Sequence, residues 1–243
     1  MKIIYSFPSR SRPEKFKACM ENIKEMSDDS DYTVLVKGDS DDASMNNADM
    51  WNWLSKNHYG HYVNFWEHSK NKIHAMNRNL DFLVPGIGDI IIGMSDDMKF
   101  TERGFDNIIR KDMRDHFPDL DGVLHYNDGM QKSNVMTMSI MGREYFNRTG
   151  YIYHPEYASL WCDVEATEVA FMLDRYKYMS NDNIIFRHMH PVWKLAEWDE
   201  QYRKSESADL YAADKAVILA RRARKYDLDP SEIINGFKYP DAL

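Results

Sequence analysis

Short apolar runs alternate with amphipathic segments along the first hundred residues. Runs rich in β-branched and aromatic residues predict strands over residues 2–7, 32–36, 62–66 and 89–94. Between these runs, apolar residues recur at helical spacing and predict helices over residues 14–26, 48–57 and 70–84. The last run is apolar throughout, as expected of a strand that is covered on both faces. The alternation therefore predicts an α/β fold with a mostly parallel central sheet and helices on both faces.

The second half of the chain has a less regular pattern. It predicts strands over 122–126 and 134–142, a helix over 163–176, a strand that runs into a loop over 183–193, and a helix from about 205 to 226. We therefore expect a mixed region followed by a helical tail.

Composition narrows the class of protein. The chain has 243 residues, of which 43% are hydrophobic, so it can bury a sizeable core. Its formal charge of −8 argues against a general nucleic-acid binder, which would be basic. The two cysteines indicate a reducing compartment rather than a disulfide scaffold. No apolar run reaches the roughly 20 residues of a membrane span, and the N-terminal run is too short for a signal peptide, so we expect a cytoplasmic protein.

Polar loops follow three of the predicted strands, at the edge where parallel sheets bind ligands. These loops are PSRSRP (8–13), KGDSDDAS (37–44) and SDDMKF (95–100). In the third loop, Asp96 and Asp97 come directly after the apolar strand. Adjacent aspartates are common in turns, but Mn²⁺ and Mg²⁺ also prefer carboxylate oxygens and share their remaining sites with phosphates. We predict a Mn²⁺ or Mg²⁺ site here, because a departing diphosphate needs its charge neutralised.

Two histidines are candidates for a further metal ligand. His188 and His190 occur in FRHMHP, and on a strand their side chains would lie on one face. The alternative is a pair of ordinary polar histidines. The spacing does not indicate which of the two would bind the ion.

Two acidic residues lie near the start of the predicted helix 163–176. Asp163 occupies its N-cap position and Glu165 its first turn. Asp163 is either a plain helix cap or a general base that takes a proton from an attacking hydroxyl. Glu165 is the second candidate for that role.

The predicted ligand edge also carries basic residues. Ser9, Arg10 and Arg12 lie in the loop after the first strand, and Lys72 lies on the helix 70–84. Each is either a solvated surface residue or a contact to a base or phosphate.

Taken together, these motifs resemble the GT-A glycosyltransferases of the family 2 type over roughly residues 1–200. The resemblance rests on SFPSRSRPEKF, KIHAMNRN, GMSDDMKF, YHPEYASLWCDVEATEVA and IIFRHMHPVW, in this order. It implies a GT-A fold and inverting transfer of a sugar from a nucleotide donor, with Asp97 on the metal and Asp163 as base. It divides the chain into a glycosyltransferase domain (1–204), with a nucleotide-binding half (1–100) and an acceptor half (101–204), and a C-terminal tail (205–243). The implied donor-binding residues are Pro8, Ser9, Arg10, Arg12, Asp39, Lys72, Asn77 and Asp96.

The sequence departs from that family's pattern in three places. Ser95 stands where the first aspartate of the metal motif often occurs. The stretch KGDSDD replaces the usual Asp-Asp-Gly-Ser, which makes Asp39 our choice for the acid that recognises the base. Asn79 replaces a frequent glycine.

We expect a UDP-sugar as donor and a hydroxyl group as acceptor, on a glycan by default and on a modified DNA base as a lesser option. The polar loop HYNDGMQKSN (125–134) is the expected acceptor loop. Two other functions stay open: a nucleotidyltransferase, although PSRSRP lacks the glycines such enzymes use, and an inactive nucleotide-sugar-binding protein, which Ser95 would favour.

Overall fold

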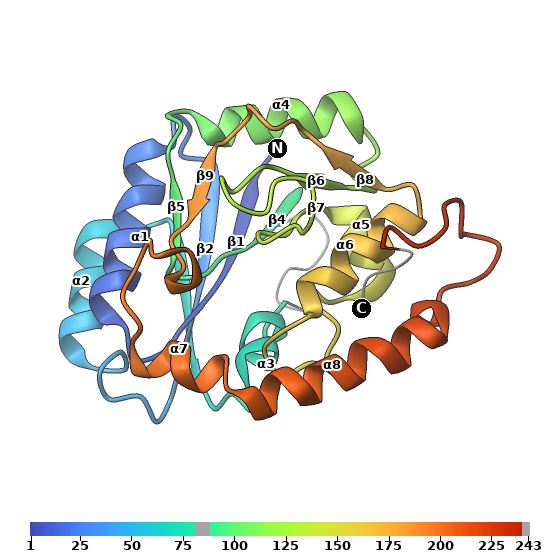
Figure 1. Cartoon of the computed structure of the whole chain (residues 1–243). Helices are drawn as coiled ribbons and strands as arrows, with labels where there is room; N and C mark the ends of the chain where they lie inside the picture. Colours follow the sequence, from blue (N-terminus) through green and yellow to red (C-terminus); the bar gives the residue numbers. More distant parts are fainter. Residues whose placement is uncertain (81–87, 240–243) are drawn as a thin grey trace.

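The computed structural model describes residues 1–80 and 88–239. A sheet in the order β3-β2-β1-β4-β7-β6-β8 forms its centre (Figure 1). These strands are β1 (Ile3–Ser9), β2 (Tyr32–Asp39), β3 (Tyr62–Glu67), β4 (Ile90–Gly93), β6 (Val123–His125), β7 (Ile140–Gly142) and β8 (Tyr176–Tyr178). Strands β1 to β4 are parallel, and β7 is antiparallel to both of its neighbours. The expected mostly parallel sheet with a mixed second half is confirmed.

Helices cover both faces of this sheet (Figure 1). They are α1 (Pro13–Met26), α2 (Ala48–His58), α3 (Lys72–Asn77), α4 (Phe105–His116), α5 (Arg143–Thr149), α6 (Cys162–Met172), α7 (Glu200–Ser205) and α8 (Ala208–Ala223), with 3₁₀ turns at Pro191–Trp193 and Lys225–Asp227. A two-stranded antiparallel ribbon, β5 (Met98–Phe100) and β9 (Phe186–His188), lies beside the sheet.

The alternation of side chains along β1 divides the core into two parts. Tyr5 and Phe7 are fully buried in a cluster with residues of α1, α2 and α4. Ile4 points the other way, into a cluster with residues of α3, α5, α6 and α8. Because neighbouring side chains of a strand face opposite sides, a continuous apolar run fills both layers.

Several element boundaries differ from the prediction. Helix α3 ends at Asn77, because Arg78 is extended and Asn79 has a φ of 58°; the last residues of the predicted helix lie partly outside the described residues. Helix α6 begins one residue early and ends at Met172, and Tyr176, the predicted last residue of the helix, starts β8. Residues 134–139 are not a strand. Helices α4, α5 and α7 and strands β5 and β8 were not predicted.

The predicted C-terminal helix is present as α8 and is part of the core. Ile218 is fully buried in the cluster that also contains Tyr157 and Ala170, and Tyr226 completes that contact just beyond the helix. Figure 1 shows α8 running along the lower edge of the molecule, beside α3 and α6. Among the described helices, none has the length and apolar character needed to cross a membrane.

Candidate active site

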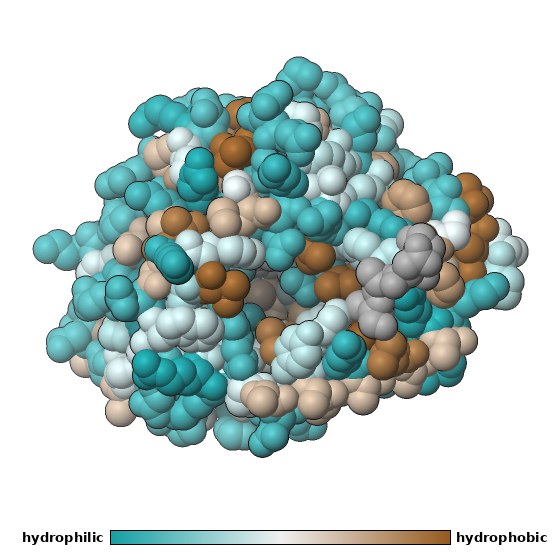
Figure 2. Space-filling view, viewed as in Figure 1, coloured by the Kyte–Doolittle hydropathy of each residue, from teal (hydrophilic) through white to brown (hydrophobic). Residues whose placement is uncertain are grey.

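The carboxyl ends of β1, β2 and β4 bring Ser9, Asp39 and Asp96 to one edge of the sheet, as parallel pairing requires. The space-filling view shows a hollow near the centre of the molecule, between the segments that carry α3, α6 and β9 (Figure 2). The candidate site lies at this edge.

Asp96 is a buried junction between three segments. Its carboxylate accepts hydrogen bonds from Ser9 Oγ at 2.7 Å and from Arg12 Nη1 at 2.9 Å. Arg12 also bonds Asp199 at 2.7 Å, and its guanidinium lies 3.8 Å from the ring centre of Tyr202. Burial raises the pKa of Asp96, and the charge of Arg12 opposes that shift. These contacts tie the loop after β1 to the loop after β4 and to α7.

Asp97 follows Asp96 in the same loop but has different partners. Its Oδ2 lies 3.3 Å from His188 Nε2 and accepts a hydrogen bond from Tyr202 Oη at 3.2 Å, while Ser95 Oγ donates to Oδ1. Burial opposes ionisation, yet the hydrogen bond and charge of His188 hold the pKa of Asp97 well below its usual range. The charged form of this carboxylate is therefore favoured at neutral pH.

The β5–β9 ribbon places His188 next to Asp97. Met98 pairs with His188 across the two strands, and the amide of Met189 donates to the carbonyl of Asp97 at 2.7 Å. The imidazole is thus held by backbone pairing of segments that are distant in the sequence.

His190 has a different environment. Strand β9 ends at His188, and His190 precedes the 3₁₀ turn, where its Nδ1 accepts from the amide of Val192 at 3.3 Å. Its Nε2 is paired with Glu206. Of the two histidines, only His188 is paired with Asp97.

The described part of the chain contains no group of three or more His, Cys, Asp or Glu side chains arranged to hold a metal ion by themselves. Asp97 and His188 nevertheless supply a carboxylate oxygen and an imidazole nitrogen that lie 3.3 Å apart. Mn²⁺ accepts both ligand types and commonly completes its shell with phosphate and water. These two residues fit an ion that is shared with a bound diphosphate.

Lys72 and Asp163 complete the charged part of the site. Lys72, at the start of α3, is exposed, and its side chain makes no hydrogen bond or ion pair with any described residue. Its charge acts on both Asp97 and Asp163, so the three groups share one region. Burial raises the pKa of Asp163, and Lys72 and His188 act against that rise.

The prediction that Asp163 caps its helix is wrong. The N-cap residue of α6 is Trp161, and Asp163 is the second helical residue. Its Oδ1 accepts only from the amide of its neighbour Val164, at 2.9 Å. The residue is partly exposed, and its second carboxylate oxygen accepts no hydrogen bond from a described residue, so it can accept one from a ligand.

Glu165 lies in the interior, on another side of α6. It is 3% exposed, accepts from Tyr157 Oη at 2.7 Å and pairs with Arg221 of α8 at 2.8 Å. Its contacts are those of a structural ion pair.

Arg10 and Asp39, two of the predicted donor-binding residues, meet at the end of β2. Arg10 pairs with Asp39 at 2.7 Å and with the exposed Asp41. The other oxygen of Asp39 is buried without a hydrogen bond, and the same holds for Nε of Arg78, whose Nη2 donates to the carbonyl of Gly38 at 2.7 Å. Sequence reasoning missed Arg78, although it directly follows Asn77 in the motif KIHAMNRN.

The remaining sequence candidates have mainly structural contacts. Asn77 donates to the carbonyl of Tyr153 at 2.5 Å and accepts from the amides of Ile152 and Tyr153. Pro8 lies inside β1, opposite Lys37 of β2.

The expected acceptor loop is built around two turns. His125 is the last residue of β6, and Asp128 accepts from the amides of Met130 and Gln131. A side chain on Gly129 would meet Arg187 of β9, so the loop lies against the strand that carries His188. Its role in acceptor binding stays a prediction.

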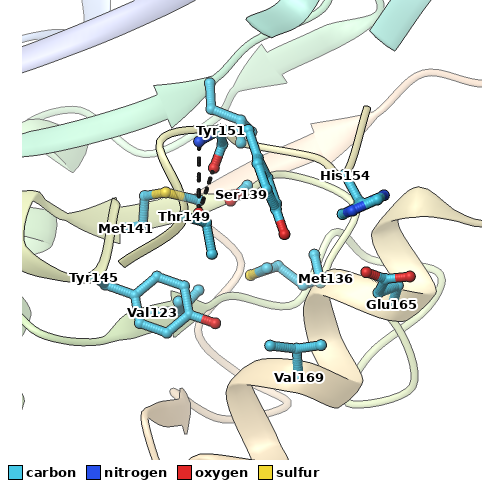
Figure 3. A pocket seen from close by; sticks show the side chains of 12 residues that line it. Val123, Met136, Ser139, Met141, Tyr145, Thr149, Tyr151, His154, Glu165 and Val169 are labelled. Atoms are coloured by element: carbon cyan, nitrogen blue, oxygen red, sulfur yellow. Dashed lines mark hydrogen bonds between the residues drawn. The ribbon is translucent and has the colours of Figure 1, made fainter. Parts of the chain in front are cut away.

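Two cavities flank these residues. One, of about 360 Å³, lies between α1 and the segment 189–202 and reaches Asp97 and Tyr202. The other, of about 30 Å³, lies among Val123, Met136 and Val169 under the sheet (Figure 3). The second has room for little more than one water molecule and cannot hold a nucleotide.

The fold is that of the GT-A glycosyltransferases. The sequence matches no family model and no curated protein. Among solved structures, the chain is similar to the mannosyltransferase PcManGT from Pyrobaculum calidifontis in complex with GDP-Man and Mn²⁺ (13% identity, TM-score 0.60, covering 95% of this chain and 77% of that one). It is also similar to TarS 1–349 from S. aureus in complex with UDP-GlcNAc (13% identity, TM-score 0.64, covering 95% and 69%). The expected GT-A fold is confirmed.

Proposed function

We propose that this protein is a metal-dependent glycosyltransferase that moves a sugar from a nucleotide-sugar to a hydroxyl acceptor with inversion. The observation that carries the proposal is the pairing of Asp97 with His188 at the carboxyl edge of the sheet, where the unpaired Lys72 and the partly exposed Asp163 also lie. Asp97, His188 and Lys72 suit a diphosphate and its ion, and Asp163 suits an attacking hydroxyl.

Each residue then has a distinct role. Asp97 and His188 hold Mn²⁺ or Mg²⁺, which when bound neutralises the diphosphate. Lys72 adds a positive charge to the same leaving group. Asp163 takes the proton of the acceptor hydroxyl while the oxygen of that hydroxyl attacks the anomeric carbon of the sugar. The bond from that carbon to the diphosphate oxygen breaks. Attack from the face opposite the leaving group gives inversion.

The donor is proposed to be a UDP-sugar. Uracil presents one N–H between two carbonyl oxygens, which suits the free oxygen of Asp39 and the free N–H of Arg78. Guanine also presents an N–H beside a carbonyl oxygen, but with an amino group on the other side, so GDP is the nucleotide to compare. The acceptor hydroxyl is assigned to a glycan.

The test is nucleotide-dependent stabilisation. UDP should raise the melting temperature more with Mn²⁺ than with EDTA, because a ligand at about 100 times its Kd adds roughly 2.7 kcal/mol to the free energy of unfolding. Asp97→Asn should remove most of that difference. Asp115→Asn, on an exposed carboxylate of α4, is the matched control and should keep it. An Asp97→Asn protein with the full Mn²⁺-dependent shift would refute the metal assignment.

An inactive nucleotide-sugar-binding protein is the alternative that Ser95 favours. Its hydroxyl bonds Asp97 where an additional carboxylate would otherwise stand. Release of UDP from UDP-sugars in the presence of Mn²⁺ distinguishes an enzyme from such a protein. A nucleotidyltransferase would instead release pyrophosphate from UTP.

A further inference from the structure

Trp161 has an unusual backbone conformation beside the proposed base. It has a φ of 64°, in the left-handed region that bulky residues rarely adopt, and it immediately precedes α6. Such strain persists where the surrounding structure enforces it, and it is concentrated at functional sites.

Asp214 of α8 enforces this conformation. Its buried carboxylate accepts hydrogen bonds from three successive amides, those of residues 158, 159 and 160, at 2.9, 2.8 and 2.7 Å. The chain is therefore fixed on one side of Trp161 by α8 and on the other side by α6. The position of the indole is set by both helices.

The same face of α8 supplies a second aromatic ring. Tyr211, one turn before Asp214, lies with its ring centre 5.3 Å from that of Trp161, and Lys215 Nζ lies 5.6 Å from the indole. Tyr211 is 48% exposed, so this aromatic pair reaches the surface. We call Trp161 and Tyr211 the aromatic platform.

We propose that the aromatic platform is the acceptor subsite and that it binds a pyranose ring of a glycan; this inference rests on the proposed function. Trp161 and Asp163 are two residues apart, so their Cα atoms are at most about 7.6 Å apart, a span that one sugar ring can bridge. The C–H face of a pyranose packs on the electron-rich face of an aromatic ring, while its hydroxyls stay free to meet a base. Nucleobases also stack on aromatic rings, but the chain's net charge of −8 disfavours a DNA acceptor.

The test is saturation-transfer NMR of the full chain with UDP and Mn²⁺, using maltose, cellobiose, lactose and chitobiose as probes. At least one disaccharide should receive saturation on its ring C–H protons. Tyr211→Ala and Trp161→Leu should each weaken that binding about five- to tenfold, the usual worth of one aromatic contact. Tyr211→Phe should retain it, and Tyr59→Ala, on a remote tyrosine that is 84% exposed, should leave it unchanged.

Three results would overturn the acceptor subsite: no disaccharide binds the parent, a bound disaccharide keeps its affinity in both platform variants, or a short oligonucleotide containing 5-hydroxymethylcytosine binds the platform instead. Titration of UDP with Mn²⁺ on the same samples separates the two proposals. If the parent binds UDP with Mn²⁺ but fails these tests, only the platform is refuted. If it does not bind UDP with Mn²⁺, the proposed function itself fails.

Discussion

His188 Nε2 lies 3.3 Å from Asp97 Oδ2, although the two residues are 91 positions apart in the sequence. Two residues further on, His190 is paired with Glu206 of the segment between α7 and α8. The motif FRHMHP therefore serves two different parts of the molecule.

The histidines should differ in their effect on metal-dependent binding. His188→Ala should weaken UDP binding in Mn²⁺ at least tenfold, because it removes one of the two proposed protein ligands, and should change little in EDTA. His190→Ala should keep the Mn²⁺ effect and cost about 1–3 kcal/mol of stability, because Glu206 loses its partner. Calorimetric titration and urea unfolding measure both. Equal Mn²⁺-dependent binding in both variants and the parent would make the segment purely structural.

Asp163→Asn should lower sugar transfer by a factor on the order of 10²–10⁴, since it removes only the ability to take a proton. Its melting temperature and UDP affinity should stay near parental values, because an amide oxygen can still accept from the amide of Val164. Turnover with a competent acceptor, beside a melting curve, is the measurement.

Asp209→Asn is the matched control for this substitution, because Asp209 is the second residue of α8, as Asp163 is of α6. It should leave turnover unchanged. Near-parental turnover of the Asp163→Asn protein would remove Asp163 from the mechanism.

Arg221→Met should lower the free energy of unfolding by about 3–5 kcal/mol, because the buried carboxylate of Glu165 loses its partner. Arg224→Met, three residues on and half exposed, should cost less than about 1 kcal/mol. A double variant with Glu165→Gln should recover part of the loss. Urea unfolding checks this series, and equal costs for the two arginines would contradict the buried pair.

Acid should destabilise the fold through His125. This histidine is 1% exposed, and burial, with the charge of Lys238, lowers its pKa from 6.5 to about 4. The unfolded chain binds the proton first, so stability is full above pH 6.5 and falls as the pH drops toward 4. The loss by pH 5 should be about 2 kcal/mol, at 1.36 kcal/mol per pKa unit.

The measurement is urea unfolding at pH 7.5 and pH 5 for the parent and for His125→Asn. The variant should lose about 2 kcal/mol less over this range. If the two proteins lose the same amount, His125 is not the group that titrates.

Strands β1, β2 and β4 could be predicted because each is a separate apolar run that fills both core layers. Strand β3 was also predicted, since its apolar residues pack partly buried against the same two clusters. Helix α4 was not predicted, although its buried residues Phe105, Ile109 and Met113 recur every four positions. The charged residues between them obscured this spacing. Strand β5 has three residues and exists through its pairing with β9, so no local pattern could reveal it.

Residue type and the family resemblance suggested the two histidines as ligands for an ion at Asp97, but no local pattern could place either one beside it. Choosing between the histidines required the end of β9 and the partner of His190, which are tertiary facts. Likewise, the buried pair of Glu165 and Arg221 depends on how α8 crosses α6. The local pattern showed only an acid in a first turn and an arginine in a basic helix end.

The two free cysteines, Cys19 and Cys162, allow local opening of the site to be measured by chemical labelling. Cys19 Sγ donates to the carbonyl of Met98 at 3.2 Å, directly behind Asp97, and Cys162 is the neighbour of Asp163. Both thiols are buried, and burial raises the pKa of each, so we expect each to react with a thiol reagent only when the surrounding structure opens. The labelling rate of Cys19 would then report local opening near the proposed metal-binding loop, and that of Cys162 would report opening at the start of α6. Variants that keep only one of the two cysteines would thus give separate labelling rates for the proposed donor and acceptor sides. A bound nucleotide should slow the labelling of Cys19.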